Sequence, residues 1–305
     1  MILITGSKKY TENIFNIKPV WEKFSLSELH EIPSTLSKKL FQTDLLFTTE
    51  IKADPLWKYC FVVEHAPQSQ FTILMEVLRN NTRFKDGIIC LAGSGQNFKG
   101  YRNRKWESLQ GNIHLSLFLN PDRSVKNFHT GFTILSAVSV VQTIDMINGL
   151  KGKASIKWVN DILINKAKVS GVITQTQTQG ENVTGVFLGI GINVLTTPKV
   201  EQDLFVPQVT SLNDHASCSE TSILKSLLNN ISKNYQLLIN NGYNKILEEY
   251  RKRSIIIGKE INIYSDPADG APKVIASGKV NRIGENLELF LEGIQDPINR
   301  GRIKF

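Results

Sequence analysis

Apolar residues in this chain fall into short runs divided by polar and turn residues, a pattern that predicts many strands and few helices. Residues 87–92 form an unbroken apolar run, typical of a buried strand, and residues 113–119 alternate between apolar and polar positions. The whole pattern predicts strands at residues 45–49, 60–64, 87–92, 113–119, 154–158, 168–174 and 183–194.

Four other segments repeat apolar residues every three or four positions, which predicts helices with a buried face. The longest covers residues 131–148, where the repeating positions are Ile134, Leu135, Val138, Val141 and Ile144. Ser219 precedes a second repeat over residues 220–235 and suits its N-cap. Shorter helices are expected at residues 72–78 and 243–253. Because strands come singly and then in hairpin-like succession, the order predicts an α+β fold.

The pattern changes at residue 255 to short strands separated by Gly, Pro, Asp and Asn turns. These strands are expected at residues 260–264, 278–280 and 287–291. We therefore expect a larger domain over residues 46–254 and a small β-barrel-like domain over residues 255–305.

Residues 1–45 show no strong periodicity and no helix-turn-helix pattern, so a DNA-binding module is not expected there. We treat them as an N-terminal extension of unclear role. Three interpretations stay open: an organelle-directing segment, a partner contact or part of the fold.

Composition narrows the class of protein. With 41% apolar and 21% charged residues among 305, the chain has the profile of a soluble globular protein, and no apolar run approaches the roughly 18 residues of a membrane span. Its apolar opening is too short for a secretory signal, and its three cysteines form no Cys-x-x-Cys pair. We expect reduced thiols and a cytoplasmic location, with an organellar pool left open.

The 36 basic and 28 acidic residues give a net charge of +8, but the basic residues are spread along the chain, so neither nucleic acid nor a membrane is an expected partner.

A basic, glycine-containing loop follows the buried strand at residues 87–92. Residues 93–106 hold three glycines, which allow close backbone approach, and four cations that suit a phosphate: Lys99, Arg102, Arg104 and Lys105. Such a loop is often only a solvated connection, but loops fed by buried strands also carry many ligand sites.

Lys157 lies in a largely apolar strand pattern, where an unpaired ammonium group would be costly. It could pair with a carboxylate, extend to the surface or face an anionic ligand. Asn160 and Asp161 follow and could be a simple turn pair. Gly189, Gly191 and Asn193 lie within an expected strand, so they do not form a dinucleotide fingerprint, but glycines in a strand mark close approach of another group.

No hydrolase motif or metal cluster competes with these segments. The five histidines are scattered, and His114, on an alternating strand, is expected to be a packing residue. The chemistry must then depend on electrostatics and positioning, as in nucleotidyl and acyl transfer.

Taken together and in this order, these segments resemble the biotin protein ligases, the holocarboxylase synthetase group, over roughly residues 45–305. The resemblance is strongest in residues 157–161 with 168–173, close to the family's Lys-Trp-Pro-Asn-Asp and Gly-Ile/Val-Leu pattern, and in residues 189–194. It implies a mixed sheet of the class II aminoacyl-tRNA-synthetase type, flanked by helices, followed by a C-terminal SH3-like β-barrel.

The resemblance also implies a two-step reaction with ATP and Mg²⁺ as cofactors. The biotin carboxylate attacks the α-phosphorus of ATP, giving biotinyl-AMP and pyrophosphate, and a lysine of a carboxylase biotin carrier domain then attacks the acyl carbon. Lys157 would be the catalytic cation, and Asp161 would help to position magnesium. The implied biotin-binding residues are Ser69, Gln70, Gln96, Gly100, Lys157 and Gly171. The implied ATP- and adenylate-binding residues are Lys99, Gly100, Tyr101, Arg102, Arg104, Trp106, Asn160, Asp161 and Asn193.

The chain departs from the family pattern in three places, one of which is that the family's glutamine just before the loop falls on Gly95 rather than on Gln96. When the loop is aligned on Trp106, residues 98–101 (Phe-Lys-Gly-Tyr) replace the family's Gly-Arg-Gly-Arg, and Gln70 replaces a threonine on the biotin side. Two alternatives therefore stay open: a lipoate or octanoate ligase, although that group's Arg-Arg-x-x-Gly-Gly-Gly segment is absent, and a non-catalytic relative. The oligomeric state, monomer or homodimer, also stays open.

Overall fold

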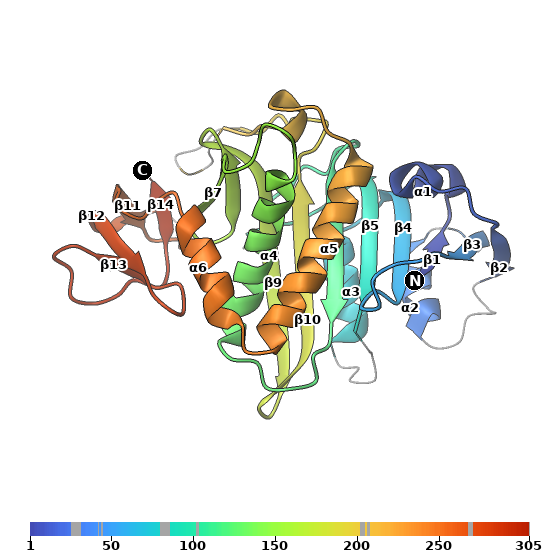
Figure 1. Ribbon diagram of the computed structural model, residues 1–305, viewed down its shortest axis with the longest axis horizontal. Helices are drawn as coiled ribbons and strands as arrows, with labels where there is room; N and C mark the ends of the chain where they lie inside the picture. Colours follow the sequence, from blue (N-terminus) through green and yellow to red (C-terminus); the bar gives the residue numbers. More distant parts are fainter. Residues whose placement is uncertain are drawn as a thin grey trace.

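The computed structural model describes residues 1–25, 32–41, 43, 45–79, 86–101, 104–201, 205, 208–267 and 271–304, and the statements below concern these residues. Its centre is a ten-stranded mixed sheet with the order β2-β3-β1-β4-β5-β6-β10-β9-β8-β7 (Figure 1). The strands are β1 (Ile2–Thr5), β2 (Glu22–Ser25), β3 (Leu45–Glu50), β4 (Tyr59–Ala66), β5 (Ile88–Gly95), β6 (Ile113–Leu119), β7 (Ala154–Lys157), β8 (Asp161–Ile164), β9 (Ala167–Gln179) and β10 (Asn182–Ile192). β4 pairs in parallel with β1 and β5, and the other described pairings are antiparallel.

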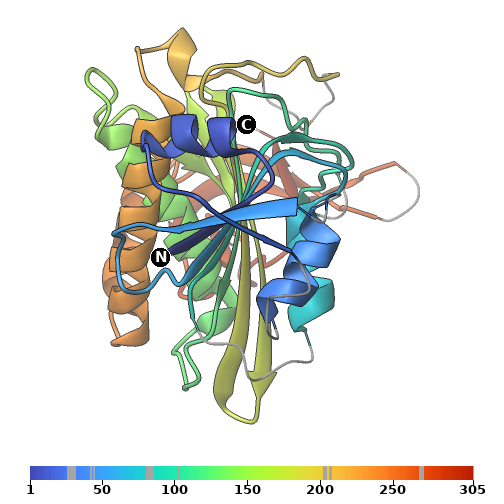
Figure 2. The same ribbon diagram turned by 90° about the vertical axis from the view of Figure 1, so that its right-hand side faces the viewer.

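Helices cover both faces of this sheet (Figure 2). The helices α4 (Phe128–Asp145), α5 (Glu220–Ile239) and α6 (Tyr243–Arg253) lie on one face, and α2 (Ile32–Leu40) and α3 (Gln70–Leu78) lie on the other. A short helix, α1 (Lys8–Phe15), packs near α5, and a 3₁₀ turn, η3, spans Leu212–Asp214. The result is a three-layer arrangement that buries the sheet from both sides.

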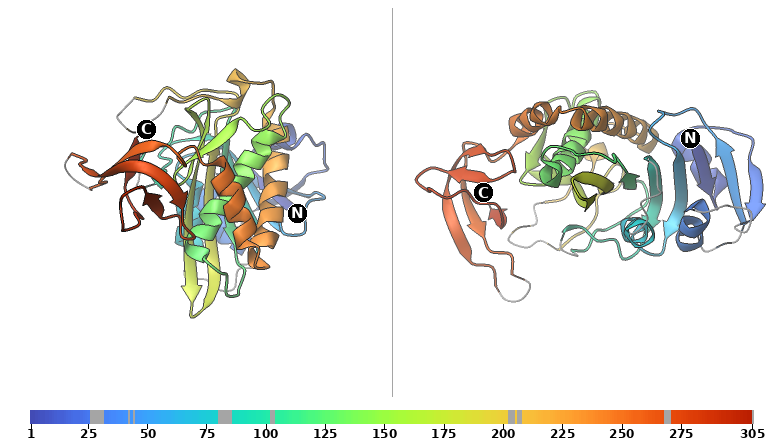
Figure 3. Two further views of the ribbon diagram at one scale, coloured as in Figure 1. Left: turned by 60° about the vertical axis from the view of Figure 1, so that its left-hand side comes forward. Right: turned by 90° about the horizontal axis from the view of Figure 1, so that it is seen from below.

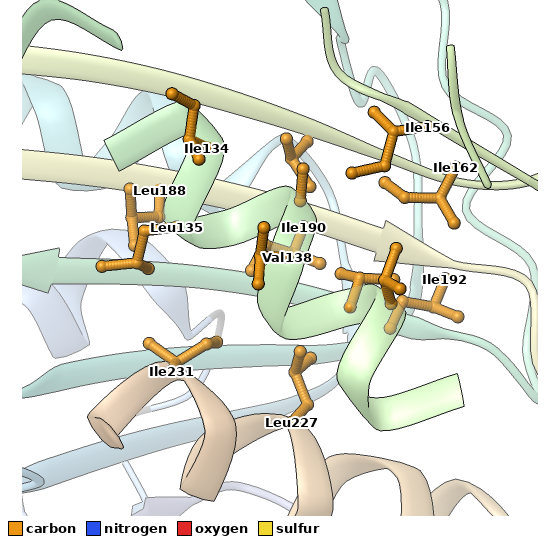
Figure 4. Close-up of a cluster of buried hydrophobic side chains, with 14 of the residues drawn as sticks. Ile134, Leu135, Val138, Ile156, Ile162, Leu188, Ile190, Ile192, Leu227 and Ile231 are labelled. Atoms are coloured by element: carbon orange, nitrogen blue, oxygen red, sulfur yellow. The ribbon is translucent and has the colours of Figure 1, made fainter. Parts of the chain in front are cut away.

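Helix α4 is buried on most sides because it lies between the sheet and α5. Figure 4 shows Ile134 and Val138 of α4 near Ile190 of β10, with Leu227 and Ile231 of α5 on the opposite side of the helix. A helix that is apolar almost all round belongs in such a position. Burying this cluster fixes the central strands, whose other face forms the candidate site.

A second, four-stranded antiparallel sheet has the order β13-β12-β11-β14 and lies at the end of the molecule opposite the N-terminus (Figure 3). Its strands are β11 (Glu260–Tyr264), β12 (Val274–Ile283), β13 (Leu289–Leu291) and β14 (Arg302–Lys304). The indole of Trp158 donates a hydrogen bond to the Leu287 carbonyl at 2.7 Å, and Ile156 forms a β-bridge with Ser254. The small sheet is therefore joined to the β7 end of the large one.

The predicted α+β fold is confirmed, as are the predicted helices and nearly all the predicted strands. The helix at Tyr243–Arg253 and the strand at Glu260–Tyr264 have the predicted bounds, and the Ser219 side chain accepts a hydrogen bond from the Ser222 amide as an N-cap. The pattern missed the short strands β1, β2, β8 and β14 and the helices α1 and α2.

The N-terminal segment is built into the fold. β1 lies between β3 and β4, with Leu3 paired to Cys60 on one side and to Thr49 on the other. Leu3 and Ile4 are buried. Of the three interpretations of residues 1–45, part of the fold is the one that the structure describes.

Candidate active site

A cavity of about 780 Å³ lies on the face of the large sheet that also carries α3. Its floor is formed by β6, β8, β9 and β10. Its walls are formed by the start of α3, by residues 98–101, 104–107 and 198–201, and by Phe205, Val209 and Arg302. The volume and the mixture of glycines, aromatic rings and a few charges are those of a small-molecule site.

Glycines of neighbouring strands make the floor flat. Gly171 lies opposite Gly191 in the β9–β10 pair and opposite Asp161 in the β8–β9 pair. A Cβ atom at Gly191 would lie 2.3 Å from the Trp106 ring, and one at Gly189 would lie 2.7 Å from Ile173. At Gly191 the close approach that the sequence predicted is thus made by Trp106, which lies against the floor.

His114 of β6 holds the Trp106 ring in place. Trp106 Nε1 donates to His114 Nδ1 at 3.3 Å, and His114 Nε2 is 3.0 Å from the Leu109 carbonyl oxygen. Both contacts together require a neutral imidazole with its proton on Nε2. Burial lowers the pKa of His114 to about 4, so the ring is neutral near pH 7 and keeps Nδ1 as an acceptor.

Lys168, at the start of β9, brings an ammonium group to the floor. Its Nζ forms an ion pair with Asp161 Oδ1 at 2.6 Å and lies 5.6 Å from the centre of the Trp106 ring. Both side chains of the ion pair are 23% exposed and line the cavity. A partly buried cation next to an aromatic ring and a glycine floor is well placed to meet an anion.

Lys157, the cation that the sequence singled out, lies outside the cavity lining. It is buried, and its Nζ donates to the Phe205 carbonyl at 2.9 Å. Phe205 itself lines the cavity, whereas Lys157 does not. The sequence pattern could not show this, because Phe205 comes from a distant segment.

The basic loop forms a short hairpin over the cavity. Lys99 and Lys105 form an antiparallel bridge, and the Gly100 amide donates to the Arg104 carbonyl at 2.7 Å. Phe98 is buried, with its ring 5.8 Å from that of His114. Phe98 therefore anchors the base of the hairpin, at the position where the resemblance expected a glycine.

Two asparagines also line the cavity. Asn193, just after β10, is 1% exposed; its Nδ2 donates to the Thr210 carbonyl at 3.0 Å, and its Oδ1 has no hydrogen-bond partner among the described residues. Asn160 Nδ2 donates to the Val172 carbonyl at 2.6 Å. Asp161 begins β8, so the pair is more than a turn.

The structure brings together most of the residues that the sequence indicated. Those that line the cavity are Ser69, Lys99, Gly100, Tyr101, Arg104, Trp106, Asn160, Asp161, Gly171 and Asn193. Gln96 is exposed and Gln70 is fully buried, and neither lines the cavity. Both amide atoms of Gln70 have no hydrogen-bond partner among the described residues. Arg102 lies outside the described residues.

The sequence missed several lining residues. Lys168 belongs to the 168–173 segment that carries the resemblance, but no feature of the sequence favoured it over Lys157 as the catalytic cation. Arg302 of β14 and Phe205 also line the cavity, and no local pattern could have linked them to it.

The described residues contain no group of three or more His, Cys, Asp or Glu side chains that could hold a metal ion. No helix among them has the length and apolar character to cross a membrane.

The profile of the biotin/lipoate A/B protein ligase family matches residues 68–193. The chain is similar to this family over these residues. The match runs from just before Ser69 to Asn193 and so contains the floor of the cavity and the hairpin over it.

Curated proteins are similar to part of this chain. The bifunctional ligase/repressor BirA of Bacillus subtilis (strain 168) is 32% identical over 186 residues, covering 60% of this chain and 56% of the relative. The biotin--protein ligase of Schizosaccharomyces pombe is 27% identical over 250 residues, covering 73% of this chain and 38% of the relative. The chain thus spans about half or less of the length of these relatives.

A solved structure supports the fold. The biotin protein ligase from Aquifex aeolicus in complex with biotin and ATP superposes with a TM-score of 0.63 at 20% identity, covering 81% of this chain and 98% of that one. At this identity the likeness concerns the arrangement of the elements.

Proposed function

We propose that the chain is a biotin protein ligase, which activates biotin with ATP and transfers it to a lysine of a carrier domain. The observation that carries this proposal is the Lys168–Asp161 pair on a floor of glycines, in a cavity whose floor lies within the family match. Relatives named as biotin ligases, one of them solved with biotin and ATP, support the same activity.

The reaction would take place in two steps. A carboxylate oxygen of biotin attacks the α-phosphorus of ATP, and pyrophosphate leaves with the electrons of the broken P–O bond. The amine of the carrier lysine then attacks the acyl carbon of biotinyl-AMP, loses a proton, and AMP leaves. Both steps gather negative charge on phosphate or acyl oxygens, and a fixed ammonium group in a partly dry site stabilises that charge.

We propose Lys168 for this electrostatic role, because its ammonium lines the cavity. The Lys157 ammonium instead holds the Phe205 backbone, so its proposed contribution is to support the wall. Catalysis by Lys157 is the competing proposal from the sequence, and replacing each lysine by Met distinguishes the two.

The remaining residues divide into two proposed groups. We propose that Ser69, Gly100 and Gly171 face biotin, with Gln70 and Gln96 supporting that end. Asn193, whose Oδ1 lacks a partner among the described residues, is proposed to accept a hydrogen bond from the adenine amine. The other proposed adenylate-binding residues are Lys99, Tyr101, Arg102, Arg104, Trp106, Asn160 and Asp161.

Magnesium would enter with ATP. The described residues offer no cluster of three ligating side chains, whereas Mg²⁺ commonly uses substrate phosphates, water and one or two carboxylates. Asp161, which lines the cavity and carries a second carboxylate oxygen beyond the one paired with Lys168, is the proposed carboxylate.

Finer structural features are also proposals. We propose that the large sheet is of the class II aminoacyl-tRNA-synthetase type and that the small one is an SH3-like barrel. We also propose domain limits at 46–254 and 255–305, with β1 and β2 of residues 1–45 completing the large sheet.

The proposed partners are biotin carrier domains of carboxylases. One relative, from Paracoccus denitrificans, is named biotin--[acetyl-CoA-carboxylase] ligase.

The test is exchange of labelled pyrophosphate into ATP by the purified chain, with biotin, lipoate or octanoate supplied in turn. Biotin-dependent exchange, followed by a streptavidin signal on a carboxylase carrier fragment, is the expected result. Exchange with lipoate or octanoate in place of biotin would identify the other branch of the family. No exchange with any acid would identify a non-catalytic relative.

A further inference from the structure

The small C-terminal sheet contacts both segments that flank the mouth of the cavity. On one side, Asp266, just after β11, forms an ion pair with Arg104 of the hairpin at 2.8 Å. On the other, Arg302 of β14 lies 3.9 Å from the centre of the Phe205 ring, and Tyr264 of β11 packs edge-on against the same ring at 5.1 Å. One sheet therefore holds two cavity walls that are far apart in the sequence.

The hairpin depends on such an outside contact. Two paired strands alone are marginally stable in water, so a hairpin of residues 98–106 needs packing or charge to stay closed. Phe98 and Trp106 anchor its base against His114 and Gly191. Farther from this base, Tyr101 is 54% exposed. The ion pair of Arg104 with Asp266 joins this part of the hairpin to the small C-terminal domain.

The Asp266 side chain is suited to this task. It is 16% exposed and does not line the cavity, whereas Arg104 is 42% exposed and does. A carboxylate two residues beyond the end of β11 provides one end of the contact, and the more exposed Arg104 provides the other. The contact is partly screened by solvent, so its effect is modest and depends on salt.

We propose that Asp266 is a positioning residue that holds the basic hairpin closed over the cavity through Arg104. The effect on retention of the adenylate rests on the proposed function, whereas the closure of the hairpin by Asp266 does not. A mixed acyl-phosphate anhydride must be kept from water until the acceptor arrives, and loops that close over a site provide that protection. The C-terminal sheet thereby controls how long the adenylate stays in the cavity.

The first test measures the closure without using activity. Asp266→Asn in the full chain should raise the rate of tryptic cleavage after Lys99, Arg104 or Lys105 by about two- to fivefold, as expected for loss of a partly exposed ion pair. The matched control is Glu292→Gln, which breaks the Lys279–Glu292 pair of the same small sheet at 2.9 Å and should leave hairpin cleavage unchanged.

The second test measures retention of the adenylate. With biotin and ATP but no acceptor, Asp266→Asn should release biotinyl-AMP about two- to fivefold faster than the wild type, and raising salt should reduce that difference. Asp266→Arg, which places a second cation beside Arg104, should raise hairpin cleavage at least as much as Asp266→Asn. The exchanged pair Arg104→Asp with Asp266→Arg should recover resistance to cleavage after Lys99 and Lys105.

Two outcomes would overturn the proposal. One is unchanged hairpin cleavage in Asp266→Asn, and the other is equal sensitivity in Asp266→Asn and Glu292→Gln. If instead the wild type forms no adenylate while the cleavage results hold, the proposed function fails and the closure stands.

Discussion

The floor and the roof of the cavity are built in different ways. The floor consists of β6, β8, β9 and β10, which are strands of the large sheet and are fixed from behind by the buried residues of α4 and α5. The roof consists of the hairpin residues 98–101 and 104–106 together with Phe205, each held by a few side-chain contacts. Rigid strands can position reacting atoms, whereas loops can open and close, so the floor should govern chemistry and the roof retention.

The largest effect is expected at the charge of the floor. Lys168→Met should reduce biotin-dependent pyrophosphate exchange about 100- to 1000-fold with little change in fold, because it removes a preorganised cation. Lys157→Met should reduce it less than about tenfold but lower the free energy of unfolding by about 1–3 kcal/mol, because a buried carbonyl loses its donor. Exchange assays with urea unfolding of both variants give the comparison, and the reverse ranking would restore Lys157 to the catalytic role.

A glycine in each region gives the next comparison. In Gly191→Ala the new Cβ would overlap the Trp106 ring at 2.3 Å, so the ring must move, and we expect exchange to fall about 10- to 100-fold. In Gly100→Ala the nearest protein atom would be the Arg104 oxygen at 3.7 Å, an ordinary contact, so the hairpin should keep its structure and exchange should fall less than in Gly191→Ala. Equal losses in both variants would show that floor and roof are not distinct.

His114 supports the floor through Trp106, and a smaller effect is expected there. His114→Phe leaves the Trp106 indole without its acceptor, so exchange should fall about three- to tenfold. The control variant is His129→Gln, in which an exposed histidine is replaced and exchange is measured in the same way. A loss that is equal in the two variants would contradict the role of the Trp106 contact.

The same histidine makes stability depend on pH. Its pKa is about 4 in the folded chain, below the ordinary value near 6.5, so between these two values the unfolded chain binds a proton that the folded chain excludes. Stability is therefore lost as pH falls from about 6.5 to 4, by up to about 3 kcal/mol from this group. Urea unfolding across this range should show a shallower fall in His114→Phe, and equal slopes would contradict the neutral imidazole.

Much of the floor could be predicted from sequence, because its residues are close together in the chain. The 168–173 and 189–194 segments predicted strands, a close approach at glycines and a ligand, and the structure places Gly171 and Gly191 opposite each other. The order of helices and strands likewise predicted the α+β fold.

The roof and the choice between the two lysines could not be predicted in this way. Whether Lys157 or Lys168 reaches the cavity depends on where Phe205 lies, and the contacts of Asp266 and Arg302 join segments more than 90 residues apart in the chain. The role of residues 1–45 was equally hidden, because β1 is only four residues long and its pairing partners come later in the chain.

The most direct measurement of the central claim is a crystal structure of the chain with a hydrolysis-resistant sulfamoyl analogue of biotinyl-AMP. We expect the analogue to lie on the glycines of β9 and β10, with Lys168 Nζ within hydrogen-bond distance of the sulfamoyl group and the hairpin closed above it. An analogue bound elsewhere, or one contacted by Lys157 while Lys168 stays paired to Asp161 away from the ligand, would contradict the claim.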